Sequence, residues 1–344
     1  MTSKIFLGWD IGGANTKVCV FDENFNIIDM HVKNITIWSN FYNLNNFFKY
    51  ISSLYSSYDI YNYITITAES CDNFKSRHAG VNQILNNCDF YISGKKYYYT
   101  NDNLYIKYDE ATANPERLYS TNWMLTSHYL NNLNEINLII DMGSTTTDFI
   151  YKNMSIIDNI DDYSRLLNNT LLYAGVVRTP LAMISEKIEF SSCTIPLIKE
   201  VFATTGDIFN ITNDIDFSKL DYSGADNLDY TRNNSFIRLS RSIGLDYDKK
   251  NEQKLIHLCE SFKKILMSLV LNNIRLLYND NLDEISLASV GEGRFLVEDL
   301  AIINSIKYKD IEKENFFSIK NVDDKLVYKN LTSALVVMNY FKIK

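Results

Sequence analysis

The chain has 344 residues, 46% of them apolar and 22% charged, which allows one two-lobed fold or two domains with a full core. The net charge of −8 argues against nucleic acid as a partner. No apolar run approaches the ~20 residues of a membrane span, and the first residues lead into a strand-like run without a signal peptide, so we expect a cytoplasmic protein with no membrane partner.

The first predicted element is a hairpin whose tip is the run Asp10 to Lys17. An apolar strand-like run, residues 5–9, precedes the tip, and a second one, residues 17–21, follows it. Glycines and exposed backbone N–H groups at such a tip let a phosphate come close. The leading carboxylate can hold a hydrated Mg²⁺ ion that in turn holds phosphates. The phosphate-binding candidates here are Gly12, Gly13, Asn15, Thr16 and Lys17.

Residues 1–133 are predicted to form the first lobe, with a small insertion of short strands at about 68–112. Glu69 follows a predicted strand and is either a site carboxylate or a solvated loop acid. Asn122 and Trp123 lie within a predicted helix and either line a pocket or pack at the junction of the lobes.

The run Asp141 to Asp148 repeats the first hairpin in altered form, 131 positions later. It also follows an apolar run and opens with aspartate, so residues 134–344 are predicted to form a duplicated second lobe. Its phosphate-binding candidates are Gly143, Ser144, Thr145 and Thr146. Two such tips facing one cleft make a clamp for a di- or triphosphate; the alternative is two ordinary glycine hairpins.

Three later segments carry further candidates. Arg178 follows a glycine turn, where its guanidinium can bind a diphosphate or pair with an acid. Thr205 and Asp207 close a helical stretch predicted from about residue 195, and they either line a pocket or cap a helix. Gly291 and Gly293 follow a predicted strand and form a possible phosphate seat.

Together these features predict an α/β protein with the two-lobed, duplicated architecture of actin, sugar kinases and heat-shock ATPases, which is ribonuclease H-like, and a cleft between its lobes. The sequence also resembles the hydantoinase/oxoprolinase-like family, and within it the synthases of methanofuran biosynthesis and their bacterial homologues linked to tetrahydromethanopterin. The strings that carry this resemblance are 8–17, 67–69, 122–123, 141–148, 173–180, 202–207 and 291–293.

The resemblance implies a transferase of methanofuran or methylofuran biosynthesis in one-carbon metabolism. It would join an aminomethylfuran diphosphate to the phenol oxygen of a tyramine or tyrosine derivative and release diphosphate. Its partners would be small molecules, and Mg²⁺ would assist. The implied acceptor pocket comprises Asn122, Trp123, Thr205 and Asp207.

On this hypothesis the hydroxyl, amide and ammonium groups of the two tips bind the diphosphate. Asp10 and Asp141 hold Mg²⁺, with Asp10 also counted as catalytic, and Arg178 neutralises charge. Glu69 or Asp148 accepts the phenol proton. Two alternatives stay open. One is an ATP-dependent cyclic-amide hydrolase or small-molecule kinase, in which ATP is the cofactor, and the other is a non-catalytic nucleotide-gated binding protein.

Overall fold

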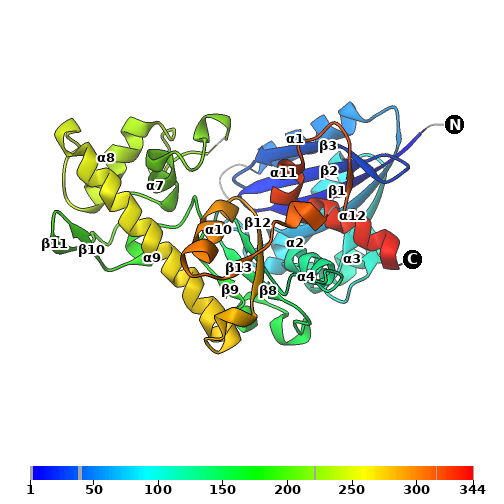
Figure 1. The fold of residues 1–344 in the computed structure, drawn as a ribbon. Helices are drawn as coiled ribbons and strands as arrows, with labels where there is room; N and C mark the ends of the chain where they lie inside the picture. Colours follow the sequence, from blue (N-terminus) through cyan, green and yellow to red (C-terminus); the bar gives the residue numbers. More distant parts are fainter. Residues whose placement is uncertain (1–2, 38–40, 221, 315, 344) are drawn as a thin grey trace.

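The computed structural model describes residues 3–37, 41–220, 222–314 and 316–343. These residues form two mixed sheets with helices around and between them (Figure 1). The larger sheet has the strand order β14-β3-β2-β1-β4-β5-β6. Its strands are β1 (Lys4–Gly12), β2 (Asn15–Phe21), β3 (Asn26–Asn34), β4 (Asp59–Thr67), β5 (Lys95–Tyr99), β6 (Tyr105–Ile106) and β14 (Ser318–Ile319).

The second sheet has the order β13-β12-β7-β8-β9. Its strands are β7 (Leu138–Met142), β8 (Thr147–Tyr151), β9 (Leu171–Leu172), β12 (Ser286–Val290) and β13 (Lys307–Tyr308). In each sheet the aspartate-bearing strand pairs antiparallel with the next strand and parallel with a later one, β1 with β2 and β4, β7 with β8 and β12. The two lobes therefore share one local topology, and the predicted duplication is confirmed.

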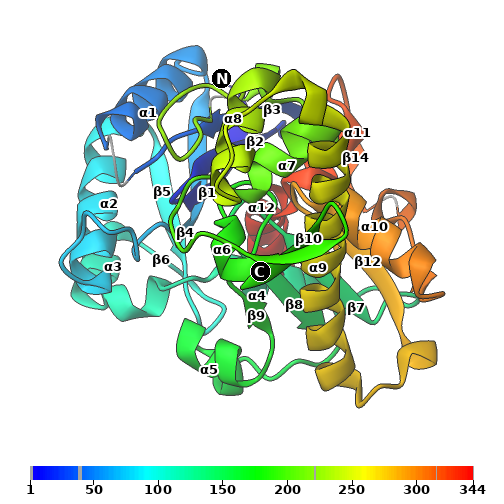
Figure 2. The ribbon, with the colours of Figure 1, turned by 90° about the vertical axis from the view of Figure 1, so that its left-hand side faces the viewer.

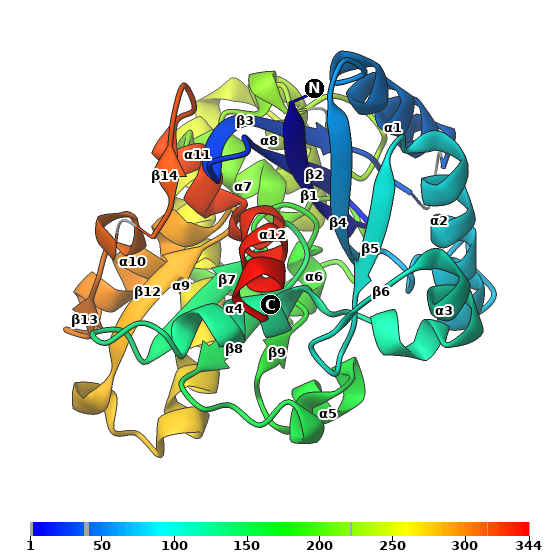
Figure 3. The same cartoon turned by 90° about the vertical axis from the view of Figure 1, so that its right-hand side faces the viewer.

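Helices cover both faces of each sheet. The outer face of the first sheet packs against α1 (Tyr42–Leu54) and α2 (Arg77–Tyr91), with α3 (Tyr108–Ala113) beside them. Two helices, α4 (Asn122–Leu130) and α12 (Leu331–Ile343), lie between the sheets (Figure 3). One apolar cluster joins these two helices to residues of both sheets, so the lobes share a continuous core.

The outer face of the second sheet packs against α9 (Glu252–Tyr278) and α10 (Arg294–Ile303). The N-terminal half of α9 carries a smaller cluster (Figure 2). This cluster includes residues of α6 (Leu181–Ile184), α7 (Thr205–Thr212), α8 (Arg232–Ser242) and the hairpin of β10 (Lys187–Phe190) with β11 (Cys193–Pro196). The remaining helices are α5 (Asp162–Leu167), α11 (Asp324–Lys329) and the 3-10 turns 115–118, 157–159, 217–219, 249–251, 282–284 and 311–314.

Two segments belong to a different part of the fold than the sequence predicts. The tail was assigned to the second lobe, but β14 pairs with β3 and α12 packs on β1 of the first sheet. The sequence predicts a small insertion at about 68–112, but β5 pairs in parallel with β4 and extends the main sheet. Both differences arise from pairing between distant segments, which local periodicity does not encode. No helix in the described part of the chain is both long and apolar enough to cross a membrane.

Candidate active site

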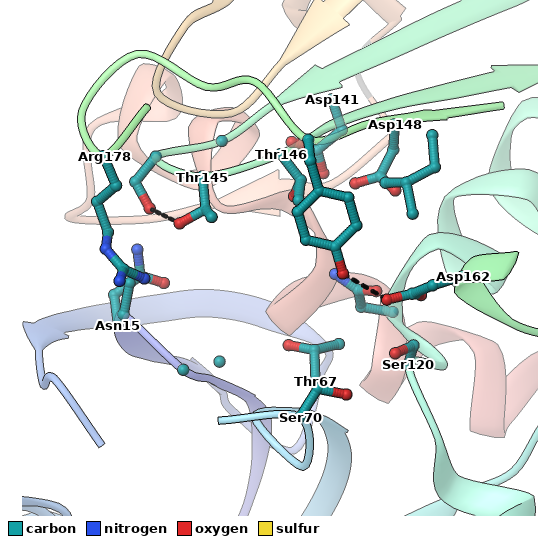
Figure 4. A pocket seen from close by; sticks show the side chains of 18 of the residues that line it. Asn15, Thr67, Ser70, Ser120, Asp141, Thr145, Thr146, Asp148, Asp162 and Arg178 are labelled. Atoms are coloured by element: carbon teal, nitrogen blue, oxygen red, sulfur yellow. Dashed lines mark hydrogen bonds between the residues drawn. The ribbon is translucent and has the colours of Figure 1, made fainter. Parts of the chain in front are cut away.

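The two hairpin tips line one cavity of about 360 Å³ (Figure 4). Strand register places Asp10 directly opposite Lys17 in the first hairpin and Asp141 opposite Asp148 in the second. Thirteen of the residues singled out by the sequence line this cavity: Asp10, Gly12, Gly13, Asn15, Lys17, Asn122, Asp141, Gly143, Ser144, Thr145, Thr146, Asp148 and Arg178. The volume lies within the usual range of small-molecule sites.

Acidic side chains that line the cavity form ion pairs with basic ones. The Lys17 ammonium lies 2.9 Å from an oxygen of Asp10, and the buried Arg165 guanidinium lies 2.6 Å from an oxygen of Asp148. Desolvation opposes the charge of Lys17, but the carboxylates of Asp10 and Asp141 outweigh it and raise its pKa. Each hairpin thus contributes a carboxylate to an ion pair, with Lys17 of the same hairpin in one case and Arg165 of α5 in the other.

Asp141 makes no such direct ion pair with any residue that the structure describes. Burial, together with repulsion from Asp148 and Asp10, raises its pKa to about 7 despite the attraction of Lys17 and Arg165. Burial likewise raises the pKa of Asp148, against the opposing effect of Arg165. The other oxygen of Asp10 is buried and has no hydrogen-bond partner among the described residues. Negative charge is therefore in excess here. The described residues contain no group of three or more His, Cys, Asp or Glu side chains placed to hold a metal ion directly, so Asp10 and Asp141 would hold a divalent cation that keeps most of its water ligands.

Arg178 is positioned by the second hairpin. The backbone N–H groups of Val176 and Arg178 donate to the carbonyls of Gly143 and Ser144, at 3.1 and 2.9 Å. A side chain on Gly175 would place its Cβ 2.5 Å from the backbone nitrogen of Thr145, so only glycine allows this close approach. Arg178 consequently extends beside Thr145 at one end of the cavity (Figure 4).

Thr205 and Asp207 lie behind this segment rather than in the cavity. The Thr205 hydroxyl donates to the carbonyl of Gly175 at 2.8 Å. Asp207 is fully buried, accepts the N–H of Thr204 at 3.0 Å and pairs with Arg238 at 2.7 Å. These residues begin α7 with a capping box, whereas the sequence predicted the end of a helix there. Their contacts hold the segment that carries Arg178 in place.

Glu69 and Trp123 are also outside the cavity. Glu69 is fully buried, and its carboxylate accepts from Arg77 at 2.8 Å and from the Ser120 hydroxyl at 2.9 Å. Trp123 is 2% exposed, and the Arg165 guanidinium lies 4.6 Å from its ring centre. Both residues therefore support groups that line the cavity, namely Ser120 and Arg165.

Three other candidates pack next to the tips. Thr16 is fully buried because side chains alternate along a strand, so that its neighbours Asn15 and Lys17 reach the cavity instead. Gly291 has φ of +85°, and a Cβ there would lie 2.5 Å from a carboxylate oxygen of Asp141. Gly293 packs against Met142 and Val176. The glycine pair thus sits against the second hairpin without lining the cavity.

The sequence reasoning missed Asp162 and Arg165, which α5 contributes to the cavity. Asp162 accepts a hydrogen bond from the phenol of Tyr173 at 2.6 Å. Burial and the charge of Asp162 raise the pKa of Tyr173, so its phenol stays protonated and donates. Asp162 and Arg178 lie at opposite ends of the cavity (Figure 4).

A duplicated two-lobed α/β arrangement with an acid-led hairpin from each lobe at one cavity is an actin-like fold. A nucleotide-free structure of acetone carboxylase shares this fold. That chain is 8% identical, with a TM-score of 0.51, and the similarity covers 86% of this chain and 66% of that one. This similarity extends to the fold alone, and no family model matches the sequence.

Two curated relatives carry one name, (4-{4-[2-(gamma-L-glutamylamino)ethyl]phenoxymethyl}furan-2-yl)methanamine synthase. The chain is 28% identical to the protein from Methanocaldococcus jannaschii, over 89% of its own length and 92% of the relative's. It is 36% identical to the protein from Methanococcus vannielii, over 42% of its own length and 65% of the relative's. The product in this name is a furan methanamine joined to a phenol through a methylene ether.

Proposed function

We propose that this chain is a transferase of methanofuran-type coenzyme biosynthesis, in the hydantoinase/oxoprolinase-like family. It joins an aminomethylfuran diphosphate to the phenol oxygen of a tyramine or tyrosine derivative and releases diphosphate. One observation carries the proposal. Hairpin tips from both lobes line one cavity in a chain that aligns, over 89% of its length, with a synthase of an aryl furfuryl ether.

The diphosphate binds at the end of the cavity that Arg178 marks. Asn15, Ser144 and Thr145 offer amide and hydroxyl donors there, and the guanidinium can bind two phosphate oxygens at once. Mg²⁺ held by Asp10 and Asp141 would supply the positive charge that neutralises the diphosphate. The excess negative charge of the site supports this assignment, because a cation relieves the repulsion that, together with burial, raises the pKa of Asp141.

The reaction exchanges one carbon–oxygen bond for another. The bond from the furan methylene carbon to the diphosphate breaks, and the diphosphate keeps the electron pair. The furan oxygen stabilises the positive charge that develops on this carbon, and the phenol oxygen then forms the new ether bond. The contribution of the protein is to neutralise the leaving group and hold the phenol in line with it.

Incubation with the aminomethylfuran diphosphate, Mg²⁺ and either γ-glutamyltyramine or tyrosine tests the proposal. We expect stoichiometric diphosphate and a product with the mass of the ether. A parallel incubation with ATP and candidate amide or sugar substrates tests the hydrolase and kinase alternatives, which require ADP. ADP formation that depends on such a substrate, without ether formation, would overturn the proposal. Partner binding that depends on nucleotide without turnover would favour the non-catalytic alternative.

A further inference from the structure

We propose that Asp162 accepts the proton of the acceptor phenol, and that the acceptor phenol replaces Tyr173 as the hydrogen-bond donor to this carboxylate. This inference rests on the proposed function. It assigns residues to the binding of the acceptor, at the end of the cavity that the diphosphate does not occupy. Its basis is the hydrogen bond of 2.6 Å in which a phenol of the protein already donates to a carboxylate in the cavity.

The transfer needs a proton acceptor because the phenol oxygen becomes an ether oxygen. Among the described residues, five aspartates line the cavity: Asp10, Asp72, Asp141, Asp148 and Asp162. Lys17 pairs with Asp10, and Arg165 pairs with Asp148. Each of these two carboxylates is therefore already engaged by a cation of the protein.

Two of the other aspartates lie near the groups that we assign to the diphosphate. Asp72 interacts electrostatically with Arg178, and Asp141 lies between the tips, next to Asp10 and Lys17. Asp162 lies away from this group, at the end of the cavity opposite Arg178 (Figure 4). A phenol bound there has its oxygen on the carboxylate while the diphosphate occupies the other end.

Two properties of Tyr173 fit a side chain whose hydrogen bond to Asp162 the acceptor can take over. Tyr173 is 53% exposed, so its ring is not enclosed by the core. Its O–H···O distance is in the range of charge-assisted hydrogen bonds from a hydroxyl to a carboxylate. The phenol of a tyramine derivative offers the same group, and by replacing Tyr173 it keeps this hydrogen bond.

The step balances as follows. The phenol oxygen forms a bond to the furan methylene carbon, the bond from this carbon to diphosphate breaks, and the phenol proton passes to the Asp162 carboxylate. The resulting carboxylic acid returns the proton to solvent when the ether leaves. Asp162 is only half buried, so water reaches it.

The test compares Asp162→Asn with Asp158→Asn, an exposed aspartate just before α5 whose loss changes the net charge equally. We expect Asp162→Asn to lower kcat for ether formation by about 10²- to 10³-fold, the usual contribution of a general base. Asp158→Asn should stay within about twofold of the wild type. The slow release of diphosphate by water, measured without acceptor, should be unchanged in Asp158→Asn.

Acceptors with fluorinated phenol rings separate a proton acceptor from a merely structural residue. An acceptor that is already ionised needs no base, so the defect of Asp162→Asn should shrink as the phenol becomes more acidic. Tyr173→Phe should keep its kcat and show an unchanged or lower KM for the acceptor. A defect of equal size on every phenol, full activity of Asp162→Asn, or a loss in Tyr173→Phe as large as that in Asp162→Asn would overturn the inference. Failure of the wild type to form the ether would instead refute the proposed function.

Discussion

Lys17 and Asp148 occupy equivalent positions in the two hairpins, each directly across the strand pair from the aspartate that opens its hairpin. The first hairpin therefore pairs a carboxylate with an ammonium group, while the second brings two carboxylates together. Arg165, from α5, compensates Asp148 but leaves Asp141 with a raised pKa. The duplicated fold is thus asymmetric in charge, and the second hairpin is the more anionic.

Replacement of Asp10 by Asn should abolish turnover and leave the fold intact. The amide keeps an acceptor for Lys17 but lacks the charge that a divalent cation requires. Since metal assistance is worth several kcal/mol in the transition state, we expect kcat to fall by about 100-fold or more. Ether formation and thermal unfolding should both be measured, with Asp299→Asn, an exposed position on α10, as the control. Turnover near the normal rate would refute the role of Asp10.

The pH dependence of stability should report on Asp141. Its folded-state pKa of about 7 lies above the usual value for an unfolded chain, so its contribution to stability is present in acid and is lost as the pH rises through 7. Asp141→Asn removes this loss. Without divalent cations, the free energy of unfolding of the variant should rise relative to that of the wild type as the pH rises, by about 1–3 kcal/mol at about pH 8. This is less than the full effect of the pKa shift, because Asp141 is partly exposed to solvent.

Urea unfolding across this pH range, with a chelator present, gives the measurement. Added Mg²⁺ should narrow the difference, since the cation stabilises only the carboxylate. A difference between variant and wild type that does not change with pH would show that the titration of Asp141 is not linked to folding.

The sequence predicted the fold and the meeting of the two hairpin tips at one cavity because local patterns determine both. A strand that ends in aspartate and a glycine turn marks each tip, and the string around Gly175 carries Arg178. The lining residues on α5 left no such signal, since Asp162 and Arg165 occur in an ordinary short amphipathic stretch and reach the cavity only through tertiary packing.

The predicted acceptor pocket shows the same limit of prediction from local patterns. Thr205 and Asp207 have the polar character of pocket residues, yet a helix cap and the burial of Arg238 against Asp207 account for that character. Helix α12 is apolar on nearly all sides because it lies between two sheets, so its pattern did not reveal which lobe it joins.

Arg178 should control diphosphate affinity. Loss of a charged hydrogen-bonding group that contacts a phosphate costs about 1.5–3 kcal/mol, so Arg178→Ala should weaken binding of diphosphate with Mg²⁺ by about 10- to 100-fold. Arg178→Lys keeps the charge but not the planar fork, and an intermediate affinity is expected. Isothermal titration calorimetry provides the values, with Arg275→Ala on the exposed side of α9 as control. Equal affinities of wild type and Arg178→Ala would place the diphosphate elsewhere.

Gly175→Ala should disturb the site through packing alone. The added methyl would lie 2.5 Å from the backbone nitrogen of Thr145 and 2.6 Å from the carbonyl oxygen of Gly143, and backbone atoms cannot move aside as a flexible side chain can. We expect a loss of about 1–3 kcal/mol in the free energy of unfolding, as for other overpacked positions. Diphosphate affinity should fall as well, because the shifted hairpin no longer aligns Thr145 with Arg178.

Gly143→Ala is the matched control for stability. A Cβ at Gly143 would meet its nearest atom, the carbonyl oxygen of Thr146, at 3.5 Å, which is ordinary contact. Chemical unfolding of both variants should therefore show a loss in Gly175→Ala that clearly exceeds the loss in Gly143→Ala. Equal stabilities would mean that the segment carrying Arg178 can move away from the hairpin, and the close packing at Gly175 would then not be what positions the guanidinium.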